Sequence, residues 1–189
     1  MRVISFLSFG LKKTNGSNNL GRITVYHRGG GVKRLYRLID FQRNIYNISA
    51  KVIGILYDPN RSAFIALICY DNGILSYIIS PKGLKIGDTV LSSINGVDTS
   101  FLIGNTYLLK HIPVGSLIHN IINFNDNFAK YVRSAGSSAI VLKQFSNGST
   151  LIKLPSNNKI LFLNGSKATI GQISNNNFNL IIKKKSRSQ

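Results

Sequence analysis

The chain has 189 residues, with 24 Lys and Arg residues against 6 acids and a formal net charge of +18. All six acids are Asp, and four of them stand in turn-like settings, which argues against a hydrolase that works through paired carboxylates. Hydrophobic residues make up 43% of the chain, enough to bury a sizeable core, so the charge favours a folded protein with a polyanionic partner. Nucleic acid is the leading candidate for that partner, ahead of a membrane surface.

Short β-branched and aromatic runs, broken by turn signals about every 8–12 residues, dominate the pattern from the N-terminus onward. Residues 1–9 are interpreted as an extended segment or a strand rather than a targeting signal. The further predicted strands are 22–26, 34–41, 51–57, 63–70, 74–79, 89–91, 117–124, 138–143, 150–154, 159–163 and 167–173. Two hairpin turns of type I′ are predicted at Asp71-Asn72-Gly73 and at Asn147-Gly148, because Asn and Gly tolerate a positive φ.

This pattern predicts an all-β chain made of two small barrels in tandem. A soft boundary falls at residues 98–105, where the strand pattern pauses. The predicted organisation is an N-terminal extension over 1–20, a first barrel over 21–100, a second barrel over 101–182 and a basic tail over 183–189.

Residue types that bind metals or perform catalysis are few and scattered. Cys69 is the only cysteine and lies in an apolar run, and His27, His111 and His119 have no helical metal-binding spacing. An enzyme would have to find a nucleophile and a base among scattered Ser and His residues. No apolar stretch approaches the roughly 18 residues that cross a bilayer. We therefore expect no catalytic site, no metal, no cofactor and no membrane partner.

The segment 21–34 is the most informative on physical grounds. Three consecutive glycines leave the backbone bare, so that a phosphate or sugar can approach its N–H groups, while cations stand on both sides. Tyr26 and His27 could stack on bases, and the glycine spacing differs from that of a Walker A loop. The predicted RNA-binding residues of this segment are Arg22, His27, Arg28, Gly29, Gly30, Gly31, Lys33 and Arg34.

Two further arginines stand in rigid or open settings. Arg61 follows the tight turn 58–60, and Arg133 precedes Ser134 and two more small residues that permit close backbone approach. Arg suits phosphate and base-edge recognition better than Lys does. Arg61, Arg133 and Ser134 are therefore added to the predicted RNA-binding residues, and the tail adds Lys183, Lys184 and Lys185.

Ordered motifs over roughly residues 15–180 closely resemble the large-subunit ribosomal protein two family. They are Gly21-Arg22-Ile23-Thr24, His27 to Arg37, Ile39-Asp40-Phe41, Tyr57 to Leu67, Ser80 to Asp88, Ile112 to Ser116, His119-Asn120, Arg133-Ser134-Ala135-Gly136 and Lys167 to Gly171. In place of the family's Gly/Lys-rich loop, residues 123–130 are rich in Asn and Phe.

The resemblance implies an oligonucleotide-binding-type barrel followed by an SH3-like barrel. It also implies binding to large-subunit ribosomal RNA, contacts with neighbouring ribosomal proteins, and a role in subunit association and in building the peptidyl-transferase region. Carried over by motif, the family's RNA-contacting arginines fall on Arg61 and Arg133. The family continues into a long basic C-terminal extension beyond the second barrel, and no catalytic-centre role is carried over to this chain.

An abundance of Ile, Asn, Lys, Phe and Tyr and the absence of Trp are typical of an AT-rich, often organellar, genome. We therefore expect a mitochondrial ribosomal protein, with a plastid-type organelle as the alternative location. We further expect a split or truncated version, whose C-terminal region is supplied by a separate chain or replaced by other proteins. The alternative function is a freestanding oligonucleotide-binding-fold protein that coats single-stranded nucleic acid.

Overall fold

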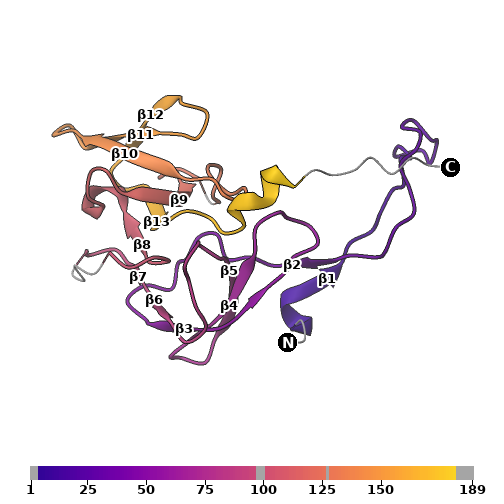
Figure 1. The fold of residues 1–189 in the computed structure, drawn as a ribbon, viewed down its shortest axis with the longest axis horizontal. Coiled ribbons are helices and arrows are strands. Elements are labelled where there is room, and N and C mark those ends of the chain that lie inside the picture. Colours follow the sequence, from indigo (N-terminus) through magenta and orange to yellow (C-terminus); the bar gives the residue numbers. More distant parts are fainter. Residues whose placement is uncertain (1–3, 97–100, 127, 182–189) are drawn as a thin grey trace. The chain divides into compact units, whose positions relative to one another are not determined.

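The computed structural model describes residues 4–96, 101–126 and 128–181 (Figure 1). Two units form, residues 1–38 and residues 39–189, and each is described by itself. Within the described residues, the helices are short 3-10 turns, and none is long and apolar enough to cross a membrane. They are η1 (Ser5–Leu7), η2 (Leu109–His111) and η3 (Asn176–Leu180).

The first unit is an arm built on a two-stranded antiparallel ribbon. In it β1 (Ser8–Gly10) pairs with β2 (Leu35–Arg37), and the rings of Phe9 and Tyr36 lie 5.1 Å apart. The predicted strand over 22–26 is wrong, because Ile23 makes only an isolated bridge with Ser17. Residues 19–35 are all exposed, so no second layer covers the apolar side chains of that run and favours a strand there.

The second unit begins with a four-stranded antiparallel sheet in the order β5-β4-β3-β6. Its strands are β3 (Ala50–Leu56), β4 (Ile65–Tyr70), β5 (Leu75–Ile79) and β6 (Thr89–Val90). In β3, buried and exposed side chains alternate, as a strand with one covered face requires. Strand β4 is buried on both faces, which explains its uninterrupted apolar sequence. Ala66, Ile68 and Ile78 are part of the core that the sheet curls around.

The remaining strands form a seven-stranded sheet in the order β12-β11-β10-β9-β13-β8-β7. Ile118, Val141, Ile152 and Phe162 are among the buried residues of its separate core. The two curled sheets fit the predicted oligonucleotide-binding-type barrel and SH3-like barrel, and the all-β class is confirmed. The strands are β7 (Ser92–Ser93), β8 (Thr106–Leu108), β9 (Leu117–Ile122), β10 (Ala139–Gln144), β11 (Ser149–Lys153), β12 (Lys159–Leu163) and β13 (Lys167–Ile170).

The two predicted hairpin turns occur, but type I′ is wrong for both. A type I′ turn needs two successive residues with positive φ, whereas here only Gly73 and Gly148 adopt it, at +83° and +79°. In the first hairpin the N–H of Gly73 donates to the carbonyl of Tyr70, whose own N–H donates to the carbonyl of Ile74. Both loops therefore have three residues and end in a glycine bulge.

The two barrels of the second unit are joined by backbone bonds and a shared apolar cluster. Pro81 and Ile173 form an antiparallel bridge, and the N–H of Phe64 donates to Ser174 Oγ at 3.2 Å. Ala63 and Ile79 of the first barrel pack with Ala135 and Ile173 of the second. This contact brings loops of both barrels together. The predicted domain limits at residues 20, 100 and 182 stay a prediction.

Candidate nucleic-acid interface

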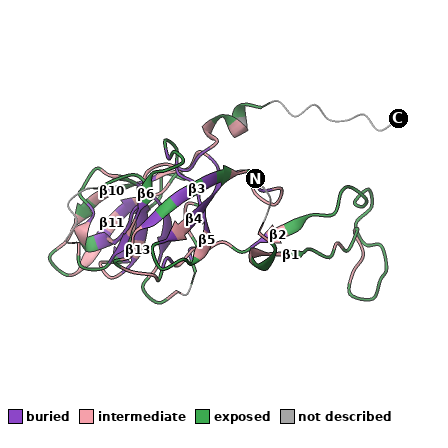
Figure 2. Ribbon diagram, turned by 90° about the horizontal axis from the view of Figure 1, so that it is seen from below, coloured by how far each residue is buried: buried purple, intermediate pink, exposed green. Residues whose placement is uncertain are grey.

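The arm concentrates positive charge on an exposed surface. Eight Lys and Arg residues and no acid lie in the sequence of residues 1–38, and of those that the structure describes only Arg37 is buried. Figure 2 shows the loop beyond β1 and β2 largely in the colour of exposed residues. All the predicted RNA-binding residues of segment 21–34 lie on this exposed loop. The arm is therefore a solvated cationic loop with no internal carboxylate to neutralise it.

Two residues outside the predicted set, Gly16 and Asn18, hold the arm's loop in shape. Gly16 has a φ of +82°, and its carbonyl accepts hydrogen bonds from the N–H groups of Thr24 and Val25. A Cβ at Gly16 would lie 2.3 Å from the carbonyl oxygen of Val25, so only glycine fits there. Asn18 Oδ1 accepts the N–H groups of Leu20 and Arg22, each at 3.0 Å. These bonds fold a loop that has no core of its own.

The glycine-rich part of the loop is held by a lysine from the opposite side of the arm. Lys13 Nζ donates to the carbonyl of Gly30 at 3.2 Å and to that of Val32 at 2.6 Å. Gly30 and Gly31 have φ values of +63° and +74°, a conformation that L side chains rarely adopt. Lys13 thus holds the carbonyls of Gly30 and Val32 in place. The glycine loop is exposed, and the contact of its backbone with a phosphate or sugar stays a prediction.

Arg61 is held by a buried carboxylate. Its Nε lies 2.5 Å from Asp58 Oδ2, and the side chains are 19% and 0% exposed. Asp58 Oδ1 also accepts the N–H of Asn60 at 3.1 Å, which closes the tight turn. The sequence predicted the rigid turn, but not that its acid pairs with the arginine. The pair fixes the direction of the guanidinium group.

Arg61 and Arg133 meet at one aromatic ring. The guanidinium carbons of Arg61 and Arg133 lie 5.9 Å and 5.6 Å from the ring centre of Phe41. The carbonyl of Phe41 accepts a hydrogen bond from Asn120 Nδ2 at 3.0 Å, so the ring's backbone is fixed to the second barrel. Arg133 and Ser134 are exposed. The structure thus brings the predicted residues of the two barrels together.

Two polar side chains are buried where the barrels meet. Arg43 Nη1 donates to the carbonyl of Gly104 at 3.3 Å, and burial lowers the pKa of Arg43. Burial, with a smaller contribution from Arg43, lowers the pKa of His119 to about 4, although the Gly171 carbonyl opposes the shift. His119 Nδ1 lies 2.9 Å from that carbonyl, so the neutral ring carries its proton on Nδ1. His119 is therefore a neutral structural residue.

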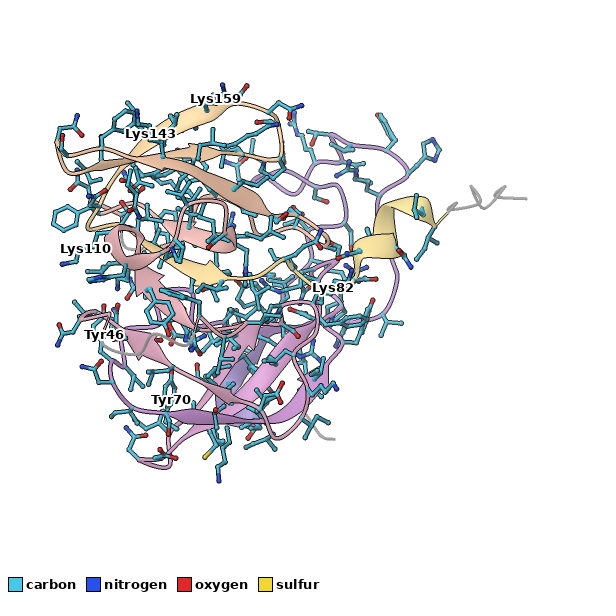
Figure 3. The ribbon with its side chains drawn as sticks, turned by 60° about the vertical axis from the view of Figure 1, so that its left-hand side comes forward. Tyr46, Tyr70, Lys82, Lys110, Lys143 and Lys159 are labelled. Atoms are coloured by element: carbon cyan, nitrogen blue, oxygen red, sulfur yellow. The ribbon has the colours of Figure 1, made fainter. Side chains whose placement is uncertain are left out.

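The rest of the charge is dispersed. Lys110, Lys143 and Lys159 are exposed on the second barrel (Figure 3). The predicted tail residues Lys183, Lys184 and Lys185 lie outside the described residues. No group of three or more His, Cys, Asp or Glu side chains suited to a metal ion occurs in the described parts of the chain. The cations of the candidate interface thus form two groups, those of the arm and the pair Arg61 and Arg133 beside Phe41.

Known protein families match both halves of the chain. The family model for "Ribosomal Proteins L2, RNA binding N-terminal domain" matches residues 5–92, and that for "Ribosomal Proteins L2, C-terminal domain" matches residues 102–188. The chain belongs to the ribosomal protein L2 family. The first L2 match contains residues 5–38 of the arm and Arg61, and the second contains Arg133.

Individual L2 relatives match over nearly the whole chain. A protein of Reclinomonas americana named large ribosomal subunit protein uL2m is 50% identical over 97% of this chain and 65% of its own length. Proteins named large ribosomal subunit protein uL2 from Chlamydia abortus and Chlamydia felis are each 47% identical over 93% of this chain and 61% of their length. The chain spans less than two thirds of the length of these L2 relatives.

Sequence reasoning missed residues outside the predicted set that hold the predicted RNA-binding residues in place. Nothing in the sequence singled out Lys13 or Gly16, and Asp58 was predicted only as part of the tight turn 58–60. Phe41 stood in a predicted strand, and nothing in its sequence context indicated two arginine neighbours. The Asp58-Pro59-Asn60-Arg61 sequence was the one available signal, since an acid three residues before an arginine can pair with it across a tight turn.

Proposed function

We propose that this chain is a structural, non-catalytic component of a large ribosomal subunit. It binds large-subunit ribosomal RNA and contacts neighbouring ribosomal proteins, and so contributes to translation. The observation that carries the proposal is the acid-free arm, whose exposed cations surround a backbone-open glycine loop. Such a surface suits phosphate contacts that position RNA rather than read its sequence.

Arg61 and Arg133 supply the second contact region. Both guanidinium groups face the ring of Phe41, which limits their motion and keeps two cations close together for RNA. The remaining predicted RNA-binding residues, including Ser134 and the tail lysines, belong to the same proposal. Binding through both regions neutralises several phosphates at once.

The test compares affinity for large-subunit RNA with affinity for random single-stranded RNA over a salt series. We expect a preference for the ribosomal RNA, and a binding constant whose logarithm falls by about 0.7–0.9 per neutralised phosphate for each tenfold rise in salt. Equal affinity for both RNAs would instead favour the freestanding single-strand-binding protein. No binding to either would overturn both functions.

One variant tests whether RNA approaches the glycine loop. At Gly29 a Cβ would meet its nearest atom at 3.6 Å, an ordinary contact, so Gly29→Ala leaves the fold intact. If a phosphate or sugar lies against this backbone, the methyl group should lower the affinity by about fivefold, comparable to the loss of one good hydrogen bond. Gly10→Ala is the control, because that Cβ would meet nothing within 4 Å. Equal affinities for the two variants would remove the loop backbone from the interface.

We also propose that the ribosome is mitochondrial. The relative named uL2m and the Asn- and Ile-rich composition support this location. Proteomics of purified mitochondrial ribosomes should find the chain, and its recovery only from cytosolic ribosomes would exclude the location. The same particles test the prediction that a separate chain supplies the family's C-terminal region.

A further inference from the structure

A cavity of about 390 Å³ in the second unit is lined by aromatic rings and amides. It lies between the segment that joins β2 to β3, which carries Tyr46 (Figure 3), and the ends of β9 and β13. We name it the Tyr46–Phe124 pocket. The lining residues that matter here are Gln42, Asn44, Tyr46, Asn123, Phe124 and Lys167.

One side of the pocket is held rigid by Lys167. Its Nζ donates to Asn44 Oδ1 at 2.7 Å, to the carbonyl of Gln42 at 3.4 Å and to the hydroxyl of Tyr46. The same ammonium group lies 4.9 Å from the ring centre of Tyr46. A ring and an amide on one side of the pocket are therefore fixed before any ligand arrives.

The other side is formed by Phe124, whose backbone is held by hydrogen bonds while its ring stays exposed. Its N–H donates to Ser166 Oγ at 3.1 Å and to Asn123 Oδ1 at 3.0 Å. A Cβ at Gly165 would lie 2.7 Å from the ring, so glycine allows the ring to lie against the turn before β13. Phe124 remains 63% exposed all the same. A large aromatic ring is thus presented to solvent by a fixed backbone.

The chemistry of the lining selects a planar ligand with polar edges. Exposed aromatic rings stack on bases, so Phe124 is the residue that would contact one here. The amides make the pocket polar but are engaged within the protein, since Asn44 Nδ2 donates to Gln42 Oε1 at 2.6 Å and Asn123 Oδ1 accepts the N–H of Phe124. The pocket's acid, Asp126, is paired with Lys130 Nζ at 2.7 Å, so it does not repel a nucleotide. Three amide side chains in the lining favour a base over an apolar side chain of another protein.

We propose that the Tyr46–Phe124 pocket receives an unpaired nucleobase of the bound RNA, which stacks on Phe124. This inference rests on the RNA binding proposed above. It adds a base-stacking contact on the second unit to an interface made mainly by cations and open backbone.

The chain contains no Trp, so one introduced indole is a unique fluorescent reporter. Phe124→Trp should be quenched when large-subunit RNA binds, because a stacked base quenches indole emission. Phe128→Trp is the matched control, since Phe128 stands on the same loop and is 55% exposed but does not line the pocket. In addition, Phe124→Leu should weaken RNA binding by about five- to tenfold, and Phe128→Leu should leave it unchanged.

The experiment uses only the full chain and RNA, so no other protein can fill the pocket. RNA binding with quenching at position 124 no greater than at position 128 would overturn the proposal and favour a protein side chain as the occupant. Failure of every variant and of the unmodified chain to bind would instead overturn the proposed function. Circular dichroism melting of Phe124→Trp shows whether the fold is intact in that variant. Tyr46→Phe keeps the ring but loses the hydroxyl that accepts from Lys167, so with a normal melting temperature it tests the pocket and not the fold.

Discussion

Arg61 and Arg133, which come from different barrels, lie against the same aromatic ring. Their guanidinium carbons are 5.9 Å and 5.6 Å from the centre of Phe41. The ring stands beside the apolar cluster that joins the two barrels. The spacing of these two cations is therefore set by barrel packing, so a change in that packing should be felt in RNA binding.

Replacing Phe41 should separate the two arginines without removing either. Phe41→Leu keeps an apolar side chain but loses two cation–ring contacts, which are worth roughly 0.5–1 kcal/mol each at exposed sites. We expect RNA affinity to fall by about five- to thirtyfold, as measured by filter binding, while Phe41→Tyr keeps near-normal affinity. An unchanged affinity for Phe41→Leu would mean that the ring does not position the arginines.

The two arginines should differ in their effect on stability. Arg61→Ala leaves the buried carboxylate of Asp58 without its ion pair, which should lower the free energy of unfolding by about 3 kcal/mol. Arg133→Ala removes an exposed side chain and one cation–ring contact, so it should lower stability by no more than about 1 kcal/mol. Urea denaturation measures both, and both variants should bind RNA less tightly.

A double variant checks the cause of the Arg61 effect. Adding Asp58→Asn to Arg61→Ala removes the uncompensated buried charge, so part of the lost stability should return. If the double variant is as unstable as the sum of the two single variants, the ion pair is not the source of the loss.

Gly16→Ala should damage the arm and spare the barrels. The added Cβ would lie 2.3 Å from the carbonyl of Val25, at a backbone φ of +82° that disfavours Ala. We expect RNA affinity to fall by about tenfold through loss of the arm's phosphate contacts, with an unchanged melting temperature of the barrels. Gly10→Ala, whose Cβ meets nothing within 4 Å, should match the unmodified chain in both measurements.

Stability should fall as the pH drops through the range set by His119. Because burial lowers the pKa of His119 from 6.5 to about 4, the unfolded chain takes up a proton at a pH where the folded chain does not. This contribution to stability is complete above the unfolded pKa and is lost on acidification toward pH 4, by up to about 3 kcal/mol.

Urea denaturation at a series of pH values tests this dependence. His119→Gln, which has no titrating ring, should be less stable at neutral pH and should lose less stability between pH 7 and pH 4. Parallel pH profiles for the variant and the unmodified chain would show that His119 does not cause the dependence.

The sequence by itself determined the all-β class, most of the barrel strands and the positions of the cationic loops. Continuous apolar and β-branched runs such as 51–57 and 63–70 are bounded by turn signals, Asp58-Pro59-Asn60 after the first and Asp71-Asn72-Gly73 after the second, so these strands can be predicted locally. The sequence did not predict strands β7 and β8, because a strand of two or three residues that include Ser and Thr has no detectable hydrophobic period.

Only the tertiary structure decided which of these residues act together. It made 22–26 an exposed loop, because no second layer covers that run, and it assigned Lys13 and Gly16 to shaping the loop. It also placed Phe41 between Arg61 and Arg133, a contact that depends on how two barrels pack. Local sequence encodes each strand and turn, whereas contacts between residues far apart in the chain arise only when the cores assemble.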